Sequence, residues 1–280
     1  MKTFAKTLAL GALIGMGSTA GAMSVDGSWS DWFSYTGNAT DFQFNTWHEN
    51  LVSLNNSGIR TQVDEEGPTP GGGAQNYDIE QIFYQYVDTD ESALTGGILY
   101  IGLVTGFPPE GRPSDNLYAG DMFVDLGNTG SYQVAIATST STTHVDTNIG
   151  PEVDNYYFGN TYTNDPLVVR DPTDFPVNTP WRAVRDAGIE NLAGLEADVM
   201  WGGIGRHNFL EIALEIPDFF EDAVTNEQDG GISLHWTMEC GNDVIDVRDQ
   251  TPFAPIPEPS TMALLGLGLM GAALRKKFAA

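Results

Sequence analysis

The strongest constraint on the fold is a series of short segments in which apolar and polar residues alternate. Residues 232–240 place Ile, Leu, Trp, Met and Cys on one side and Ser, His, Thr and Glu on the other. Residues 209–216 repeat the pattern, with Glu211 and Glu215 on a polar side that we expect to face water. A period of two is typical of a β-strand with one buried face.

Further strands are predicted because runs rich in β-branched and aromatic residues are separated by turn residues. The predicted strands are residues 77–87, 96–107, 121–126, 131–138, 209–216, 232–240 and 244–247. Helical pattern is scarce, with a candidate at residues 181–187. Short strands joined by Gly- and Asn-rich turns predict an all-β chain, an antiparallel β-sandwich with jelly-roll or immunoglobulin-like layering. A barrel is the alternative.

The amino-terminal segment has the pattern of a secretory signal peptide. Lys2 and Lys6 precede an apolar run, and Ala20-Gly21-Ala22 supplies small residues at the spacing of a cleavage site. We predict that residues 1–22 form a signal helix removed by signal peptidase, so that the chain is exported.

The carboxy-terminal segment combines a proline pair, an apolar run and basic residues. Residues 262–274 are apolar but fewer than the roughly 20 residues that span a bilayer comfortably. The basic residues Arg275, Lys276 and Lys277 are expected to stay in the cytoplasm. We divide the chain into residues 23–250 as a β-sandwich domain, 251–259 as a Pro-rich stalk, and 260–280 as a hydrophobic transmembrane helix with a basic tail.

The tail resembles the sorting signal of PEP-CTERM proteins, on the basis of Pro257, Glu258 and Pro259 followed by the apolar run and the basic cluster. The resemblance implies that an exosortase-type membrane protease recognises the tail and cuts it. It also implies a transient anchor in the inner membrane, followed by release to the cell surface or extracellular matrix. A permanent tail anchor is the alternative interpretation.

The body between these two ends is strongly acidic. The whole chain has 12 Lys+Arg and 38 Asp+Glu. Removing five basic residues and one acidic residue at the ends leaves 7 arginines and 37 acidic residues, a formal charge of −30. Such a charge excludes nucleic acid and a lasting association with anionic membranes, because both need cationic partners. It favours solubility and divalent cations.

Cys240 is the single cysteine, so the chain forms no intramolecular disulfide. A buried thiol and an intermolecular bridge both remain open as its role.

No catalytic motif is present among the His, Ser and Gly patterns of hydrolases or nucleotide-binding enzymes, and we therefore predict a protein that is not an enzyme. Calcium is the candidate ion, because acidic residues cluster in turns. The first choice of metal ligands is Asp88, Asp90 and Glu91. Three other clusters contain Asp64, Asp121 with Asp125, and Asp243.

Aromatic residues in loops are candidates for polysaccharide binding, since their rings stack on the apolar face of a sugar. The candidates are Trp29, Trp32, Tyr156, Tyr157, Tyr162, Trp181 and Trp201. For Trp29 and Trp32 the alternative is a packed strand edge. Trp236 lies in the apolar register of its strand, which indicates the core.

The body also resembles carbohydrate-binding-module-family-9-like and DOMON-like β-sandwiches, through residues 26–32, 99–104, 120–125 and 211–217. The resemblance implies an extracellular module that binds polysaccharide. One alternative is an acidic matrix protein that contacts other proteins without a small ligand. The other is a secreted glycan hydrolase.

Overall fold

The computed structural model describes the body of the chain with several gaps. The described residues are 23–35, 51–55, 58–64, 75–88, 96–112, 114, 117–130, 132–140, 161–163, 167–168, 182–183, 197–205, 207–216, 223–225, 230–239, 241 and 243–253. The predicted signal helix, the hydrophobic tail and Cys240 lie outside these residues.

Almost all described elements are strands, as the alternating segments predict. In chain order they are η1 (Trp29–Asp31), β1 (Phe33–Tyr35), β2 (Leu51–Leu54), β3 (Arg60–Val63), η3 (Gln75–Tyr77), β4 (Ile79–Asp88), β5 (Gly97–Thr105), β6 (Met122–Leu126), β7 (Val134–Ile136), β8 (Thr161–Thr163), β9 (Leu167–Val168), β10 (Arg182–Ala183), β11 (Ala197–Ile204), β12 (His207–Ile216), β13 (Ile232–Thr237) and β14 (Val244–Asp249).

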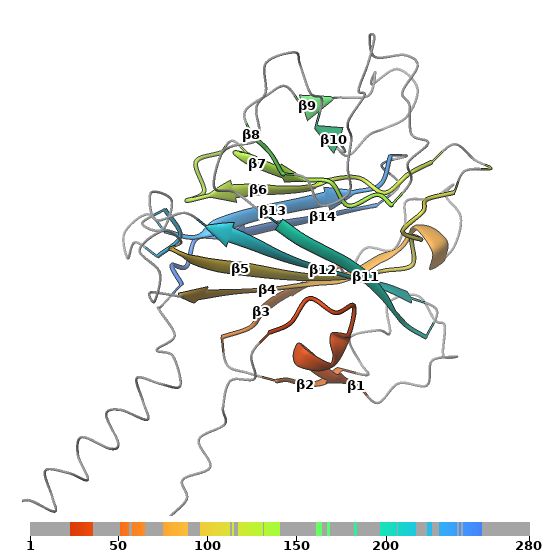
Figure 1. The fold of residues 1–280 in the computed structure, drawn as a ribbon, viewed down its shortest axis with the longest axis horizontal. Coiled ribbons are helices and arrows are strands. Elements are labelled where there is room, and N and C mark those ends of the chain that lie inside the picture. Colours follow the sequence, from red (N-terminus) through yellow and green to blue (C-terminus); the bar gives the residue numbers. More distant parts are fainter. Residues whose placement is uncertain are drawn as a thin grey trace, which may run out of the picture.

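Two five-stranded antiparallel sheets form the two layers of a β-sandwich (Figure 1). The first sheet has the order β11-β12-β5-β4-β3, and the second has the order β14-β13-β6-β7-β8. Two small sheets, β1-β2 and β9-β10, lie outside these layers. The prediction of an all-β sandwich is therefore confirmed, and the sheets do not close into a barrel.

The core fills the space between the two sheets. Alternate residues of β5 and β12, such as Leu99 and Ile212, face similar residues of β6 and β13. Trp236 is fully buried there, and its indole N–H donates to the carbonyl of Gly120 at 3.1 Å. Because both sheets contribute one apolar face to a single cluster, burial of that cluster is the main stabilising contribution to the sandwich.

The predicted hairpins are present. Strand β4 pairs with β5, β6 pairs with β7, and β13 pairs with β14, each antiparallel. The expectation of a helix at residues 181–187 is wrong where the structure describes that segment, since β10 there pairs with β9. Two residues in a strand ladder cannot share the backbone angles of a helix.

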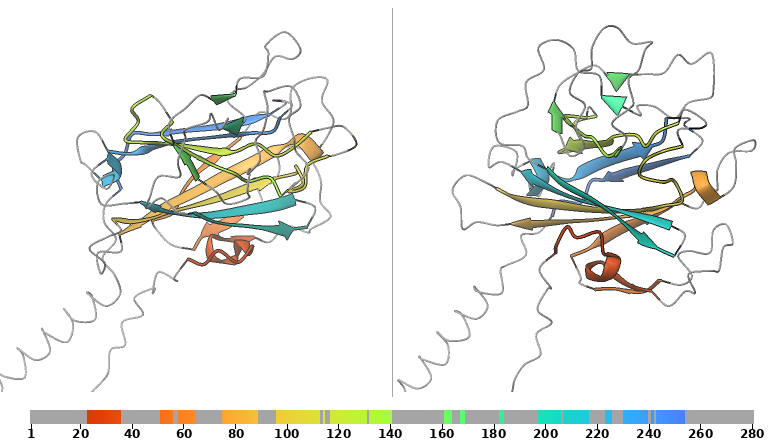
Figure 2. Two further views of the ribbon diagram at one scale, coloured as in Figure 1. Left: turned by 45° about the horizontal axis from the view of Figure 1, so that its top comes forward. Right: turned by 45° about the vertical axis from the view of Figure 1, so that its right-hand side comes forward.

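The first sheet is covered on both faces, which distinguishes it from a simple sandwich. Its inner face packs on the core, and the amino-terminal segment with η1 and the β1-β2 pair lies against its outer face (Figure 2). We call residues 23–32 the strap. The strap and the rows of side chains beneath it define the surface on which the candidate site lies.

Candidate functional site

The strap is fastened to the first sheet by the carboxylate of Glu211. The Oε2 atom accepts hydrogen bonds from the backbone N–H groups of Asp26, Gly27 and Ser28, at 3.1, 2.6 and 3.1 Å. The Oε1 atom accepts one from the indole of Trp32 at 2.8 Å. Glu211 is 1% exposed, so the expectation that it faces water is wrong, because a distant segment covers its face of β12.

Glycines allow the strap to approach the sheet closely. Gly27 has a φ of 77°, and a Cβ at this position would lie 2.9 Å from the carbonyl oxygen of Trp201. A Cβ on Gly202 would overlap the carbonyl oxygen of Gly27. On β5, Gly102 leaves the space that the Trp32 ring occupies, 3.1 Å from where its Cβ would be. Gly27 needs glycine for its backbone angle as well as for contact, whereas Gly202 and Gly102 need it for contact alone.

The aromatic residues of the opening motif pack against the sheet. Trp32 is 1% exposed and lies beside Phe83 and Phe209, with ring centroids 6.3 and 6.4 Å away. Trp29 is half-buried and stacks on Phe33 at 5.5 Å. Trp32 is thus no sugar platform, because its ring is covered and its N–H is satisfied. The packed interpretation holds for Trp32, and Trp29 belongs to the same cluster.

The remaining predicted aromatic residues are not gathered into one site by the described structure. Trp201 is half-buried against the core, and its indole donates to the carbonyl of Thr138 at 2.7 Å. Tyr162 belongs to β8. Tyr156, Tyr157 and Trp181 lie outside the described residues.

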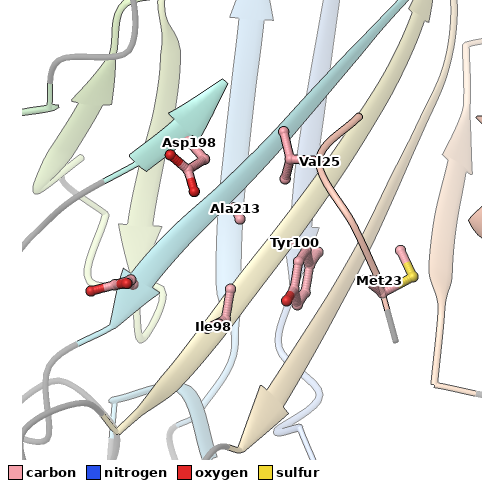
Figure 3. Close-up of a pocket in the computed structure, with 7 residues that line it drawn as sticks. Met23, Val25, Ile98, Tyr100, Asp198 and Ala213 are labelled. Atoms are coloured by element: carbon pink, nitrogen blue, oxygen red, sulfur yellow. The ribbon is translucent and has the colours of Figure 1, made fainter. Parts of the chain in front are cut away.

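A pocket of about 270 Å³ lies on the outer face of the first sheet, beside the strap (Figure 3). Its geometry follows from strand register. Tyr100 of β5 is opposite Ala213 of β12, which in turn is opposite Asp198 of β11. Ala213 is small, so the space between the larger side chains of Tyr100 and Asp198 stays open. The hollow is therefore built into the sequence of three neighbouring strands.

The next row of the same face and the strap complete the pocket. Ile98 of β5 is opposite Glu215 of β12, and both line it. Met23 and Val25 of the strap form one side, across Tyr100 from Asp198 in Figure 3. The pocket thus combines an aromatic ring, aliphatic side chains and two carboxylates, from segments far apart in the sequence.

The electrostatics of the pocket favour a neutral phenol beside a carboxylate. Burial raises the pKa of Tyr100 above its usual value of 10.0, and the nearby Asp198 carboxylate raises it further. The phenol therefore keeps its proton at neutral pH and can donate a hydrogen bond. Sequence reasoning missed Tyr100 because it lies in an apolar run. A signal existed, since Ile98, Tyr100 and Gly102 share the face of β5 opposite to Leu99.

A second group of ionisable residues lies where β3, β4 and the β13-β14 turn meet. Asp78 shares a hydrogen bond with Glu80, and Asp243 shares one with Asp64. Burial, followed by the Glu80 carboxylate, raises the pKa of Asp78 to about 8. Burial raises the pKa of Asp243 to about 9, assisted by Asp64. We call these four residues the carboxyl cluster.

Two further contacts define the carboxyl cluster. His207 of β12 lies 2.8 Å from Glu80, between Nε2 and Oε1. Asp243 accepts the backbone N–H of Ile79 at 2.7 Å, which ties the β13-β14 turn to the start of β4. The arrangement is two carboxyl pairs that hold protons. Within the described ranges, no three His, Cys, Asp or Glu side chains are placed to hold one metal ion.

Two of the candidate calcium ligands, Asp64 and Asp243, belong to the carboxyl cluster, whereas Asp88 lies at the opposite end of β4 from Asp78. Asp88 is the last residue of β4, while Asp90 and Glu91 lie outside the described residues. Asp125 closes the β6-β7 turn instead, because its carboxylate accepts from the backbone N–H groups of Thr129 and Gly130, each at 2.8 Å. The Asp125 carboxylate therefore stabilises the turn through hydrogen bonds to its backbone.

Comparison with known proteins identifies a sorting motif in the tail. Residues 255–277 match the model of the PEP-CTERM protein-sorting motif. No curated protein and no solved structure matches the chain. The motif indicates an exosortase-targeted protein located at the cell surface or outside the cell. The expected resemblance of the body to carbohydrate-binding-module-like folds is not supported by any neighbour.

The sorting residues Pro257, Glu258, Pro259, Arg275, Lys276 and Lys277 lie outside the described residues. Among the residues that the structure describes, no helix has the length and apolar character needed to cross a membrane.

Proposed function

We propose that this chain is an exported surface or extracellular-matrix protein whose β-sandwich binds polysaccharide through the outer-face pocket. The observation that supports the proposal is the pocket itself, in which the ring of Tyr100 lies between strap residues and the carboxylate of Asp198. Sugar sites combine apolar surface for the ring with acceptors for hydroxyl groups. The proposal is of a binding protein and not of an enzyme.

The size of the pocket fits one sugar unit of a longer chain. Small-ligand sites measure roughly 300–1,000 Å³, and this pocket of about 270 Å³ is slightly smaller than that range. We propose that a single ring enters while its neighbours extend over the sheet. Asp198 and Glu215 would accept hydroxyl hydrogens, and the Tyr100 phenol would donate to a sugar oxygen.

The test is a glycan-array titration of the exported protein and of two variants. In Ala213→Leu the larger side chain fills the hollow, so we expect selective binding to fall at least about tenfold. Met200→Ser alters the most exposed large apolar residue of the same face, one row away, and serves as the matched control. If Ala213→Leu binds as the unmodified protein does, the pocket is not the site.

Calcium is included in the proposal as a bound ion and is tested by repeating the titration with a chelator. Loss of binding in chelator would place an ion in or beneath the site, and unchanged binding would remove calcium from the proposal. Release of reducing ends during the titration would instead indicate a glycan hydrolase.

A second candidate function is an acidic matrix protein without a small ligand. The formal charge of −30 in the body favours it, because dense like charge keeps a protein soluble and lets it attract cationic surfaces. Absence of binding to every glycan, with and without calcium, would support this candidate over the pocket.

A further inference from the structure

The two carboxylates of the pocket have no partner of opposite charge in the described structure. Asp198 is exposed on β11 and Glu215 is half-exposed on β12, and each points to the outer face. Within the described part of the chain, neither forms a hydrogen bond or an ion pair. Their positions are diagonal neighbours on adjacent strands, a spacing of roughly 7–8 Å between residues, with the Cβ atoms somewhat closer. One small cation can therefore approach both.

The arginine side chains that the structure describes lie outside the pocket and interact with other residues. Arg60 forms an ion pair with Asp249 at 2.7 Å. Arg112 lies over the ring of Tyr77, 5.0 Å from its centroid. Arg248 belongs to β14 of the second sheet, where its positive charge helps to lower the pKa of Asp246. The predicted cleavage after Ala22 would add one α-amino group at Met23, which is across Tyr100 from Asp198.

An anionic sugar entering this pocket would be repelled by the two carboxylates, whose charge no described basic side chain neutralises. The formal charge of −30 on the body would add to this repulsion. A neutral sugar would gain hydrogen bonds only. A sugar carrying an ammonium group would gain charge-assisted hydrogen bonds, which are roughly twice as strong as neutral ones. Its ring carbons would still pack against Tyr100 and Ile98, which line the pocket.

We propose that the outer-face pocket selects a cationic amino sugar, the repeating unit of a polysaccharide that has lost its N-acetyl groups. The inference rests on the proposed function and specifies its ligand class. In the complex, the ammonium group lies between Asp198 and Glu215. The Tyr100 ring covers the apolar face of the sugar, and its phenol donates to a ring or hydroxyl oxygen.

The experiment compares two oligosaccharides that differ only in the acetyl group, hexamers of glucosamine and of N-acetylglucosamine. Binding to the exported protein is measured by calorimetry at pH between about 5 and 6, above the ordinary carboxyl pKa values of about 4. We expect the glucosamine hexamer to bind at least about tenfold more tightly. We also expect its affinity to fall with added salt, because exposed charges are screened.

Matched variants distinguish selective binding in the pocket from the general attraction between a polycation and an acidic protein. Asp198→Asn and Glu215→Gln each remove one charge from the pocket. Glu110→Gln removes one charge from an exposed loop position outside the pocket lining. We expect about a fivefold to tenfold loss of affinity for each pocket variant and less than a twofold loss for Glu110→Gln.

The possible results distinguish failure of the amino-sugar inference from failure of the polysaccharide-binding function on which it rests. Equal losses in Asp198→Asn and Glu110→Gln would overturn the inference, because the attraction would then be general. Equal affinity for the two hexamers, abolished by Ala213→Leu, would overturn the inference and leave the polysaccharide function standing. Binding of neither hexamer, nor of any other glycan, would overturn both.

Discussion

At the scale of single residues, Glu211 is the side chain on which the strap depends most. Replacing it with Gln puts an amide N–H₂ group where an oxygen now accepts N–H groups. We expect Glu211→Gln to lower the free energy of unfolding by about 1–3 kcal/mol, the usual cost of leaving buried donors unsatisfied. Urea denaturation followed by tryptophan fluorescence measures the change.

Glu215→Gln is the matched control for Glu211→Gln, since it makes the same chemical change four residues away on the same face of β12. Its carboxylate is half-exposed and forms no hydrogen bond within the described residues. We expect an effect within about 0.5 kcal/mol, as for surface substitutions in general. Equal destabilisation by both variants would show that the strap bonds do not account for the cost.

The contrast between these two glutamates shows what sequence reasoning achieves for a residue. Alternation in residues 209–216 correctly places Leu210 and Ile212 in the core and both glutamates on the opposite face. It does not show what covers that face. The cover for Glu211 comes from Gly27, 184 residues earlier in the chain. A periodic pattern is local, whereas burial is decided by whichever segment packs there.

At the scale of elements, strands with strong local signals are the ones that were predictable. Strands β5 and β13 lie within the runs that indicated them, and β12 begins two residues before its run and ends with it. The strap has no such period, and its motif left both a sugar platform and a packed strand edge open for Trp29 and Trp32. The pocket was not predictable either, because it requires the register of β11, β12 and β5, which no single segment encodes.

The close approach of the strap to β11 gives a prediction at Gly27. Gly27→Ala places a Cβ 2.9 Å from a carbonyl oxygen in a backbone conformation that L-residues rarely adopt. We expect it to lower the free energy of unfolding by at least about 2 kcal/mol, as strain and overlap add. Chemical denaturation measures the cost, and hydrogen exchange of β5 and β12 amides reports loosening of the strap.

Gly130→Ala is the control for the backbone contribution. Gly130 has a similar φ of 83°, but no atom lies within 4 Å of where its Cβ would be. We expect a cost of about 1 kcal/mol, which reflects the left-handed conformation alone. A cost for Gly27→Ala no greater than that for Gly130→Ala would mean that the contact with Trp201 is unimportant.

At the scale of the whole molecule, the carboxyl cluster makes stability depend on pH. Asp78 and Asp243 have folded-state pKa values of about 8 and about 9, above the ordinary value of 3.8. The folded state therefore binds more protons than the unfolded state between about pH 4 and 9. Stability supplied by the bound protons is lost as pH rises through this window. We expect at least about 1 kcal/mol less stability at pH 8 than at pH 5 from this source.

Asp78→Asn tests the origin of that dependence, because it removes one of the groups that ionise while keeping a polar side chain beside Glu80. We expect the variant to lose less stability than the unmodified protein when both are denatured at pH 5 and pH 8. Parallel pH profiles for the two proteins, or stability that rises with pH in the unmodified protein, would contradict this account.

The sorting motif concerns the whole molecule because it begins directly after the folded body. Phe253 is 3% exposed, Arg60 lies 3.9 Å over its ring, and Arg60 also donates to the carbonyl of Pro252 at 2.8 Å. The match to the sorting motif starts two residues later, at residue 255. Cleavage within the motif therefore leaves every described contact of the body intact.

Replacing Pro257, Glu258 and Pro259 with alanine tests the exported route. We expect the processed form outside the cell to fall at least about tenfold and an uncut precursor to accumulate with the membrane, as cell fractionation and immunoblotting would show. The alanines permit helix where the prolines break it, so the extended stretch that a protease needs is lost. Pro252→Ala changes a nearby proline outside the motif and should leave processing unchanged. Normal amounts of processed protein from the triple variant would show that these three residues do not direct sorting.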